Sequence, residues 1–102
     1  MQRIVYMARL KADKVEDYKQ PHKNVWVELI REASQSGIKN HGCFLRGRDL
    51  IIYLETEDYE KTQKEFGAKD VTRRWDRYMA EFFDPSFPSQ ELEPWEEVFH
   101  ME

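Results

Sequence analysis

Two segments of this chain carry apolar residues on both faces of a predicted strand. Arg3–Lys11 reads RIVYMARLK, and Asp49–Glu55 reads DLIIYLE. Successive side chains of a strand point to opposite faces, so a strand with this pattern must be covered from both sides. The chain therefore predicts a sheet with helices on one face and a second cover on the other.

The segment after the first strand predicts helix in two parts. Asp13 is a candidate N-cap for a helical turn over Val15–Lys19. Proline is well tolerated at the first position of a helix, so a longer helix is expected from Pro21 to about Ser34. Gly37 is expected to end it.

The rest of the chain continues the alternation of strands and helices. Ile38–Arg46 predicts a strand that forms a hairpin with Asp49–Glu55, and Tyr59–Phe66 predicts a short helix. Asp70 is expected to cap an amphipathic helix over Val71–Phe83, and Glu96–Met101 is read as a last strand. The order β-α-β-β-α-β is that of a ferredoxin-like α+β domain with an antiparallel sheet.

With 102 residues the chain is expected to form a single domain, 1–102. Two helical regions cover only one face of its sheet. The apolar residues on the other face predict a two-fold homodimer that packs sheet to sheet, and the alternative is that the C-terminal tail folds back over that face. A net charge of −4 with mixed signs argues against nucleic-acid binding.

Several classes of site and location are not expected. Cys43 is the single cysteine, and it is most simply a small apolar strand residue. No metal-ligand spacing and no Gly-rich phosphate loop is present, so no metal or cofactor is expected. We find no signal peptide and no run of 18 apolar residues, which predicts a cytoplasmic protein without membrane contact.

The candidate site begins with a stripe at helical spacing formed by Tyr18, His22, Trp26 and Leu29. An imidazole titrates near neutrality and can give or take a proton, while a phenol and an indole can hold a small polar ligand. The pattern alone leaves open whether this stripe is a core face or the wall of a pocket.

Three further residues extend the candidate site. Trp75 shares helical spacing with core residues of its own segment, so it fits either a core or a pocket. Asn40 offers a donor and an acceptor to a hydroxylated ligand, although a strand-edge role fits equally well. Because neighbouring strand residues alternate faces, only one of Asn40 and His41 is expected to point where His22 points.

Several spaced motifs together resemble the L-rhamnose mutarotase family along essentially the whole chain. They are Tyr18-x3-His22-x3-Trp26-x-Glu28-Leu29, Gly37-x2-Asn40, Leu50-Ile51-Ile52, Arg74-Trp75-x2-Tyr78-Met79 and Glu97-Val98-Phe99. The resemblance implies a small ferredoxin-like protein that forms a dimeric α/β barrel. It also implies an enzyme that interconverts the α and β anomers of a 6-deoxy-hexose without a cofactor.

The resemblance also implies roles for individual residues. His22 matches the proton-donating histidine of the family, Tyr18 its sugar-contacting tyrosine, and Trp75 the first of a tryptophan pair that contacts the sugar. Trp26 is expected to support the histidine from the core side. Proton transfer by one imidazole is also what the residues themselves could provide.

Two positions depart from the family pattern. Asp76 stands where the second tryptophan is expected, and His41 stands where a binding tyrosine is common. A carboxylate in place of an indole removes a stacking surface and adds an acceptor for hydroxyl groups, so the preferred sugar could be L-rhamnose or L-fucose. Two other functions fit the same fold: a small dimeric monooxygenase and a sugar-binding module without catalysis.

Overall fold

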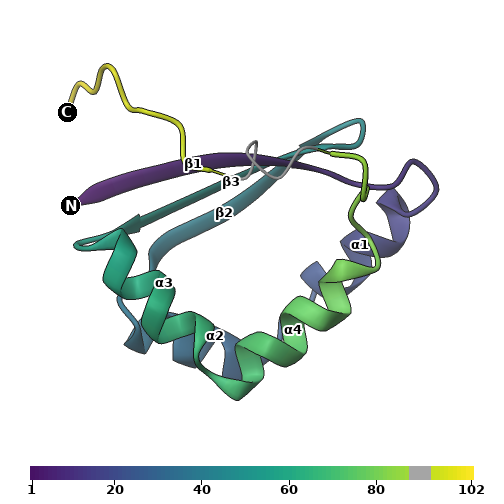
Figure 1. The fold of residues 1–102 in the computed structure, drawn as a ribbon, viewed down its shortest axis with the longest axis horizontal. Helices are drawn as coiled ribbons and strands as arrows, with labels where there is room; N and C mark the ends of the chain where they lie inside the picture. The colour runs from purple at the N-terminus through teal and green to yellow at the C-terminus, as the bar shows by residue number, and fades with distance from the viewer. Residues whose placement is uncertain (88–92) are drawn as a thin grey trace.

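The computed structural model describes residues 1–87 and 93–102, and it has one antiparallel sheet with four helices on one side (Figure 1). The strands follow the order β1-β3-β2, which places β3 in the centre. This arrangement confirms the predicted α+β class. The elements are β1 (Gln2–Arg9), α1 (Val15–His22), α2 (Val27–Gln35), β2 (Lys39–Arg46), β3 (Asp49–Thr56), α3 (Tyr59–Gly67) and α4 (Asp70–Ala80).

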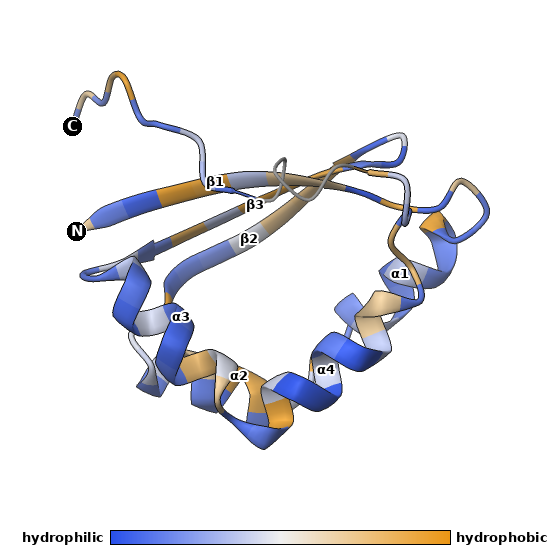
Figure 2. Ribbon diagram, viewed as in Figure 1, coloured by the Kyte–Doolittle hydropathy of each residue, from blue (hydrophilic) through white to orange (hydrophobic). Residues whose placement is uncertain are grey.

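The face of the sheet toward the helices carries the core. Leu50, Ile52 and Leu54 of β3 are buried on this face, and Leu54 and Leu50 are paired with Ile4 and Ala8 of β1. Burial of each such leucine or isoleucine side chain contributes about 1.5–3 kcal/mol. Figure 2 shows apolar stretches along the strands, while the helices mix polar and apolar residues. The two-residue alternation predicted from the sequence is therefore present in β1 and β3.

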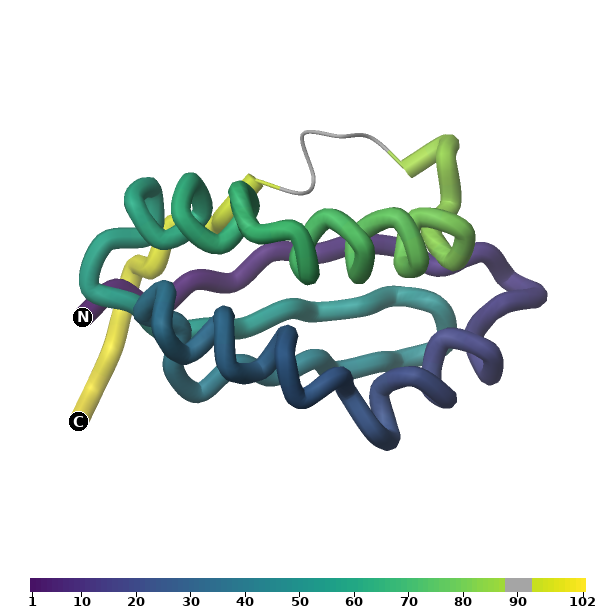
Figure 3. Tube along the Cα trace, turned by 90° about the horizontal axis from the view of Figure 1, so that it is seen from below, coloured from purple at the N-terminus to yellow at the C-terminus, as the bar shows by residue number. Residues whose placement is uncertain are grey.

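The core is divided between the two ends of the sheet. One cluster includes Leu10 and Phe82 near the β2–β3 turn, and the other includes Ile4 and Ile38 at the opposite end. Figures 1 and 3 show the helices arching beneath the sheet from one end to the other. Residues of both clusters, such as Leu50 and Ile38, line a cavity between the sheet and the helices.

The first helical region differs from the prediction. The prediction of one helix from Pro21 to Ser34 is wrong, because α1 runs through Pro21 to His22 and α2 begins only at Val27. Pro21 sits in the last turn of α1, where its missing N–H removes one backbone hydrogen bond and the helix ends one residue later. Trp26 then has an extended conformation (ψ 126°) at the N-cap of α2. The predicted stripe is therefore split between two helices.

Other helix ends are shifted by a few residues. Lys14 rather than Asp13 precedes α1 as its N-cap, and Lys69 rather than Asp70 precedes α4. Neither lysine side chain makes a capping hydrogen bond. The fourth helix ends at Ala80 rather than Phe83. Asp58 is the N-cap of α3, since its side chain accepts a hydrogen bond from the Lys61 backbone N–H.

The C-terminal tail runs beside β1 on the side away from the helices (Figure 1). The Trp95 backbone N–H donates to the Val5 carbonyl at 2.8 Å, and Arg3 Nε donates to Glu97 Oε2 at 2.8 Å. The predicted strand over 96–101 is nevertheless wrong, because no strand is formed there. Among the described residues 93–102, Trp95 alone makes a backbone hydrogen bond to β1, so the tail does not continue as a paired strand.

The outer face of the sheet remains only partly covered. Val5, Ile51 and Tyr53 are half-buried on this face, and Phe44 on the β2 edge is 63 % exposed. The tail is bonded to β1 through Trp95 and Glu97, while Phe44 on the β2 edge stays exposed. Of the two alternative covers predicted from the sequence, the tail therefore lies against part of this face, and a second copy remains a prediction.

Candidate functional site

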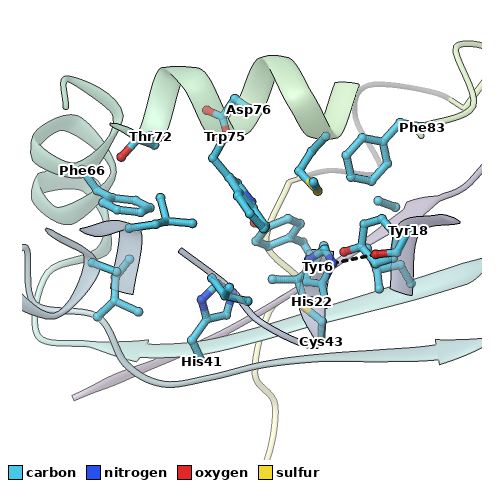
Figure 4. Close-up of a pocket in the computed structure, with 18 of the residues that line it drawn as sticks. Tyr6, Tyr18, His22, His41, Cys43, Phe66, Thr72, Trp75, Asp76 and Phe83 are labelled. Carbon is cyan, nitrogen blue, oxygen red and sulfur yellow. Dashed lines mark hydrogen bonds between the residues drawn. The ribbon is translucent and has the colours of Figure 1, made fainter. Parts of the chain in front are cut away.

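A cavity of about 1200 Å³ lies between the sheet and the helices (Figure 4). Small-molecule sites usually measure about 300–1,000 Å³, so this one is large enough for a small ligand and surrounding water. Most of its lining is aromatic or aliphatic. Of the residues predicted for the site, six line this cavity: Tyr18, His22, Asn40, His41, Trp75 and Asp76.

The imidazole of His22 is held in one orientation. Its Nδ1 lies 2.8 Å from the carbonyl oxygen of Tyr18, one turn earlier in α1. A carbonyl oxygen only accepts hydrogen bonds, so Nδ1 donates and Nε2 keeps the lone pair. The ring also stacks on Tyr18, with centroids 4.2 Å apart, and meets the edge of Trp75 at 5.4 Å. His22 therefore has one nitrogen available to exchange a proton with a ligand.

Tyr18 belongs to both the core and the cavity. Only 5 % of Tyr18 is exposed to solvent, and its ring packs edge to face against Phe82, with the ring centroids 5.9 Å apart. Burial first, and then contact with the Cys43 thiol, raise the pKa of the Tyr18 hydroxyl well above its usual range. This hydroxyl therefore stays protonated near neutral pH and can donate a hydrogen bond.

Cys43, predicted only as a small apolar strand residue, also lines the same cavity. Desolvation raises the pKa of its thiol, and the Tyr18 hydroxyl opposes that shift. A thiol with a raised pKa is a poor nucleophile at neutral pH. The raised pKa therefore makes the Cys43 thiol a weaker candidate for chemistry in this cavity than the His22 imidazole.

Trp75 projects from α4 into the middle of the cavity (Figure 4). Behind it lies Trp26, whose ring meets Trp75 edge to face at 5.0 Å and stacks parallel to Tyr78 at 6.1 Å. Trp26 does not line the cavity in the part of the chain that the structure describes. The support of the histidine by Trp26 therefore stays a prediction, and its ring contacts are with Trp75 and Tyr78.

A bulge in β2 changes the predicted orientation of Asn40 and His41. The pairing of β2 with β3 shifts between Lys39 and Gly42, and Asn40 has a φ of 50°. A bulge breaks the strict alternation of side chains, so both residues border the cavity although only one was expected to. The Asn40 amide already donates to Glu55 Oε1 at 2.9 Å. His41 therefore has the freer polar group of the two.

Two titratable side chains of the cavity have shifted pKa values. Desolvation lowers the pKa of His41, and the neighbouring His22 lowers it further. Desolvation raises the pKa of the Asp76 carboxyl, which also lines the cavity. Both shifts favour the uncharged form of the side chain, and a neutral imidazole can donate or accept a hydrogen bond.

Tyr6 also lines the cavity and was not among the predicted site residues. Burial raises the pKa of its hydroxyl to about 12. The signal was present in the sequence, since Tyr6 lies two residues from both Ile4 and Ala8 and therefore shares their core face of β1. A tyrosine placed on the core face of a strand is a candidate for a cavity wall.

Residues 1–87 and 93–102 contain no group of three His, Cys, Asp or Glu side chains arranged to hold a metal ion. Within the same residues, every helix is too short or too polar to span a bilayer.

Comparison with known proteins agrees with this architecture. The solved structure of an L-rhamnose mutarotase from Formosa agariphila superposes with a TM-score of 0.79 over 100 % of both chains at 20 % identity, which supports the ferredoxin-like fold. An uncharacterised NIPSNAP domain protein from Burkholderia xenovorans superposes with a TM-score of 0.62 over 82 % of this chain and 85 % of that one, at 12 % identity.

Sequence comparison is more specific than the fold. An L-rhamnose mutarotase from Oceanobacillus iheyensis is 30 % identical over 108 aligned positions that cover 100 % of both chains. One from Bacillus subtilis is 39 % identical over 71 positions, covering 67 % of this chain and 66 % of the relative. The sequence profile of the L-rhamnose mutarotase family matches residues 3–101. The chain therefore belongs to the L-rhamnose mutarotase family.

Proposed function

We propose that this protein interconverts the α and β anomers of a 6-deoxy-hexose, with His22 carrying the proton and no cofactor. The observation that carries this proposal is the geometry of His22. Its Nδ1 is bonded to the Tyr18 carbonyl, and Nε2 remains available beside a cavity walled by aromatic rings. The relatives named L-rhamnose mutarotase support a sugar as the ligand.

The reaction requires only the movement of one proton between two oxygens. Neutral His22 accepts the proton of the anomeric hydroxyl at Nε2, and the C1–O1 bond becomes a carbonyl as the bond between C1 and the ring oxygen breaks. The imidazolium gives the proton to the ring oxygen. Rotation about C1–C2 then presents the other carbonyl face, and the same steps in reverse close the ring. An imidazole can both accept and give a proton, which suits both directions of the reaction.

The surrounding residues would hold the sugar at this imidazole. The Trp75 ring offers a flat apolar surface for the C–H face and methyl group of a deoxy sugar. The protonated Tyr18 hydroxyl can donate to a sugar oxygen. His41 and Asp76 provide further hydrogen-bonding groups for hydroxyls around the ring.

Saturation transfer between the two anomeric protons of a free sugar tests this function. We expect the protein to raise the exchange rate of L-rhamnose, L-fucose or another 6-deoxy-hexose above the rate in buffer alone. A panel of these sugars identifies the preferred one. Binding of a sugar without faster exchange would instead identify a non-catalytic binding module.

The residue at position 76 should influence which sugar is preferred. Asp76→Trp supplies the second indole of the family pattern and removes an acceptor for hydroxyls. We expect the ratio of exchange rates, L-rhamnose over L-fucose, to increase by about tenfold, which corresponds to about 1.4 kcal/mol. An unchanged ratio in the saturation-transfer assay would remove Asp76 from sugar selection. Arg77→Trp serves as the control, because Arg77 is the residue after Asp76, is exposed and does not line the cavity.

We further propose that two chains form a homodimer through the outer faces of their sheets. Phe44 is 63 % exposed on this face, and the tail beside β1 exposes Val98 (87 %) and Phe99 (78 %). We expect light scattering to give twice the 12.4-kDa mass of one chain. Phe44→Glu should shift the equilibrium toward monomer, whereas Lys61→Glu on the exposed side of α3 should not. A monomeric wild-type protein would contradict the proposal.

A further inference from the structure

The hydroxyl of Thr72 has no hydrogen-bond partner among the residues that the structure describes, although it is buried. Thr72 lies in the first turn of α4 and is 4 % exposed. A helical threonine commonly bonds a carbonyl of the preceding turn, and a buried hydroxyl left unpaired costs about 1–3 kcal/mol. Such a group calls for a specific explanation.

Thr72 lines the same cavity as His22 but at the other end of it. Figure 4 shows Thr72 beside Phe66, with Tyr18 and His22 on the far side and Trp75 between them. Met79, seven residues along α4, belongs to the core cluster at the His22 end. Seven residues of helix span about 10 Å, so Thr72 and Met79 lie at opposite ends of the cavity wall that α4 provides.

We propose that Thr72 is a specificity-determining residue that binds the sugar hydroxyl opposite the anomeric carbon, the one on C4. This inference rests on the proposed function, because it uses His22 to place the anomeric carbon. In a pyranose ring, C4 lies across the ring from C1. A sugar that presents C1 and its ring oxygen to His22, with Trp75 along one face, directs its C4 edge toward the Thr72 end.

The chemistry of the site matches a hydroxyl at that position. The Thr72 hydroxyl can donate one hydrogen bond and accept others. Asp76 follows one turn later, at i+4 on the same side of α4, and also lines the cavity. A sugar hydroxyl between them could accept from Thr72 and donate to Asp76. A hydrogen or a methyl group in that place would leave Thr72 unpaired.

This assignment explains how the cavity could distinguish two rival sugars. L-Rhamnose and L-fucose differ in configuration at C2 and at C4. A group that reads the direction of the C4 hydroxyl would therefore separate them, whereas Trp75 contacts the C–H surface that both sugars offer. Thr72 supplies a discriminating contact that the resemblance to the family did not identify.

A cycle that combines a protein variant with a deoxy sugar tests the proposal. Thr72→Val keeps the shape of the side chain and removes the hydroxyl, while Thr72→Ser keeps the hydroxyl. We expect Thr72→Val to weaken binding of the preferred 6-deoxy-hexose by about 3- to 10-fold, measured as Kd by calorimetric titration. The 4-deoxy analogue of that sugar should bind the wild-type protein and Thr72→Val with equal Kd. Thr72→Ser should retain most of the affinity for the parent sugar.

Thr62→Val provides the matched control. The Thr62 hydroxyl is also buried, but it donates to the Ser36 carbonyl at 3.1 Å and contacts the Thr56 hydroxyl at 2.7 Å. Thr62 does not line the cavity. Thr62→Val should therefore lower the Tm without changing Kd for the sugar. Thr72→Val should leave the Tm equal or higher, because it removes an unpaired buried hydroxyl.

The outcomes separate this inference from the proposed function. An equal loss of affinity for the parent sugar and its 4-deoxy analogue, or no loss for either, would overturn the role of Thr72. Selective binding without faster anomer exchange would overturn the proposed reaction and leave the role of Thr72 supported. A wild-type protein that binds no 6-deoxy-hexose at all would overturn both.

Discussion

Replacement of His22 by alanine is expected to reduce catalysed anomer exchange by about 10²–10⁴-fold, the usual contribution of a positioned acid or base. The side chain is half-buried at the end of α1, and its loss leaves the Tyr18 carbonyl with access to the cavity. The fold should therefore survive. Saturation transfer on the preferred sugar measures the rate, and circular dichroism checks the structure.

The control for this variant is Lys23→Ala. Lys23 directly follows His22, is exposed and does not line the cavity. Its exchange rate should match that of the wild-type protein. A His22→Ala variant that exchanges anomers at the wild-type rate would eliminate the imidazole from the reaction.

Trp75→Ala is expected to lower kcat/KM for anomer exchange by tenfold or more. The substitution removes the flat wall that the sugar would contact, and it removes the edge that holds the His22 ring at 5.4 Å. Aromatic contacts of this kind are worth about 0.5–1.5 kcal/mol each, and about 1.4 kcal/mol corresponds to tenfold. The loss of the wall should raise KM, and the loss of the edge contact should lower kcat.

Two further substitutions separate these effects. Trp75→Phe keeps a flat ring and should recover part of the activity. Trp26→Ala leaves the cavity lining intact but removes the ring that meets Trp75 at 5.0 Å, so a smaller decrease is expected. Equal rates for Trp75→Ala and the wild-type protein would show that the sugar does not lie against this indole.

The parts of the fold that follow from local pattern were predictable from the sequence. The alternation in β1 and β3 identified the strands, because a two-residue period on a sheet fixes which side chains face the helices. The amphipathic spacing of α4 identified a helix whose Trp75 and Met79 point inward. The same spacing brought Tyr18 and His22 together, since residues four apart share one face of α1.

Other features depended on contacts that a sequence pattern does not report. Pro21 is compatible with either the first or the last turn of a helix, and the choice depended on the extended backbone at Trp26. The bulge that turns both Asn40 and His41 toward the cavity depends on the left-handed φ of Asn40. The unpaired hydroxyl of Thr72 is defined by the absence of a hydrogen-bond partner among the described residues, which only three-dimensional structure shows.

The most direct test of the central claim is a crystal structure of the protein with its preferred 6-deoxy-hexose bound. We predict that the anomeric oxygen lies within hydrogen-bond reach of His22 Nε2, about 2.6–3.2 Å, with the sugar ring against Trp75. A sugar bound outside this cavity, or bound inside it with the anomeric carbon turned away from His22, would contradict the mechanism.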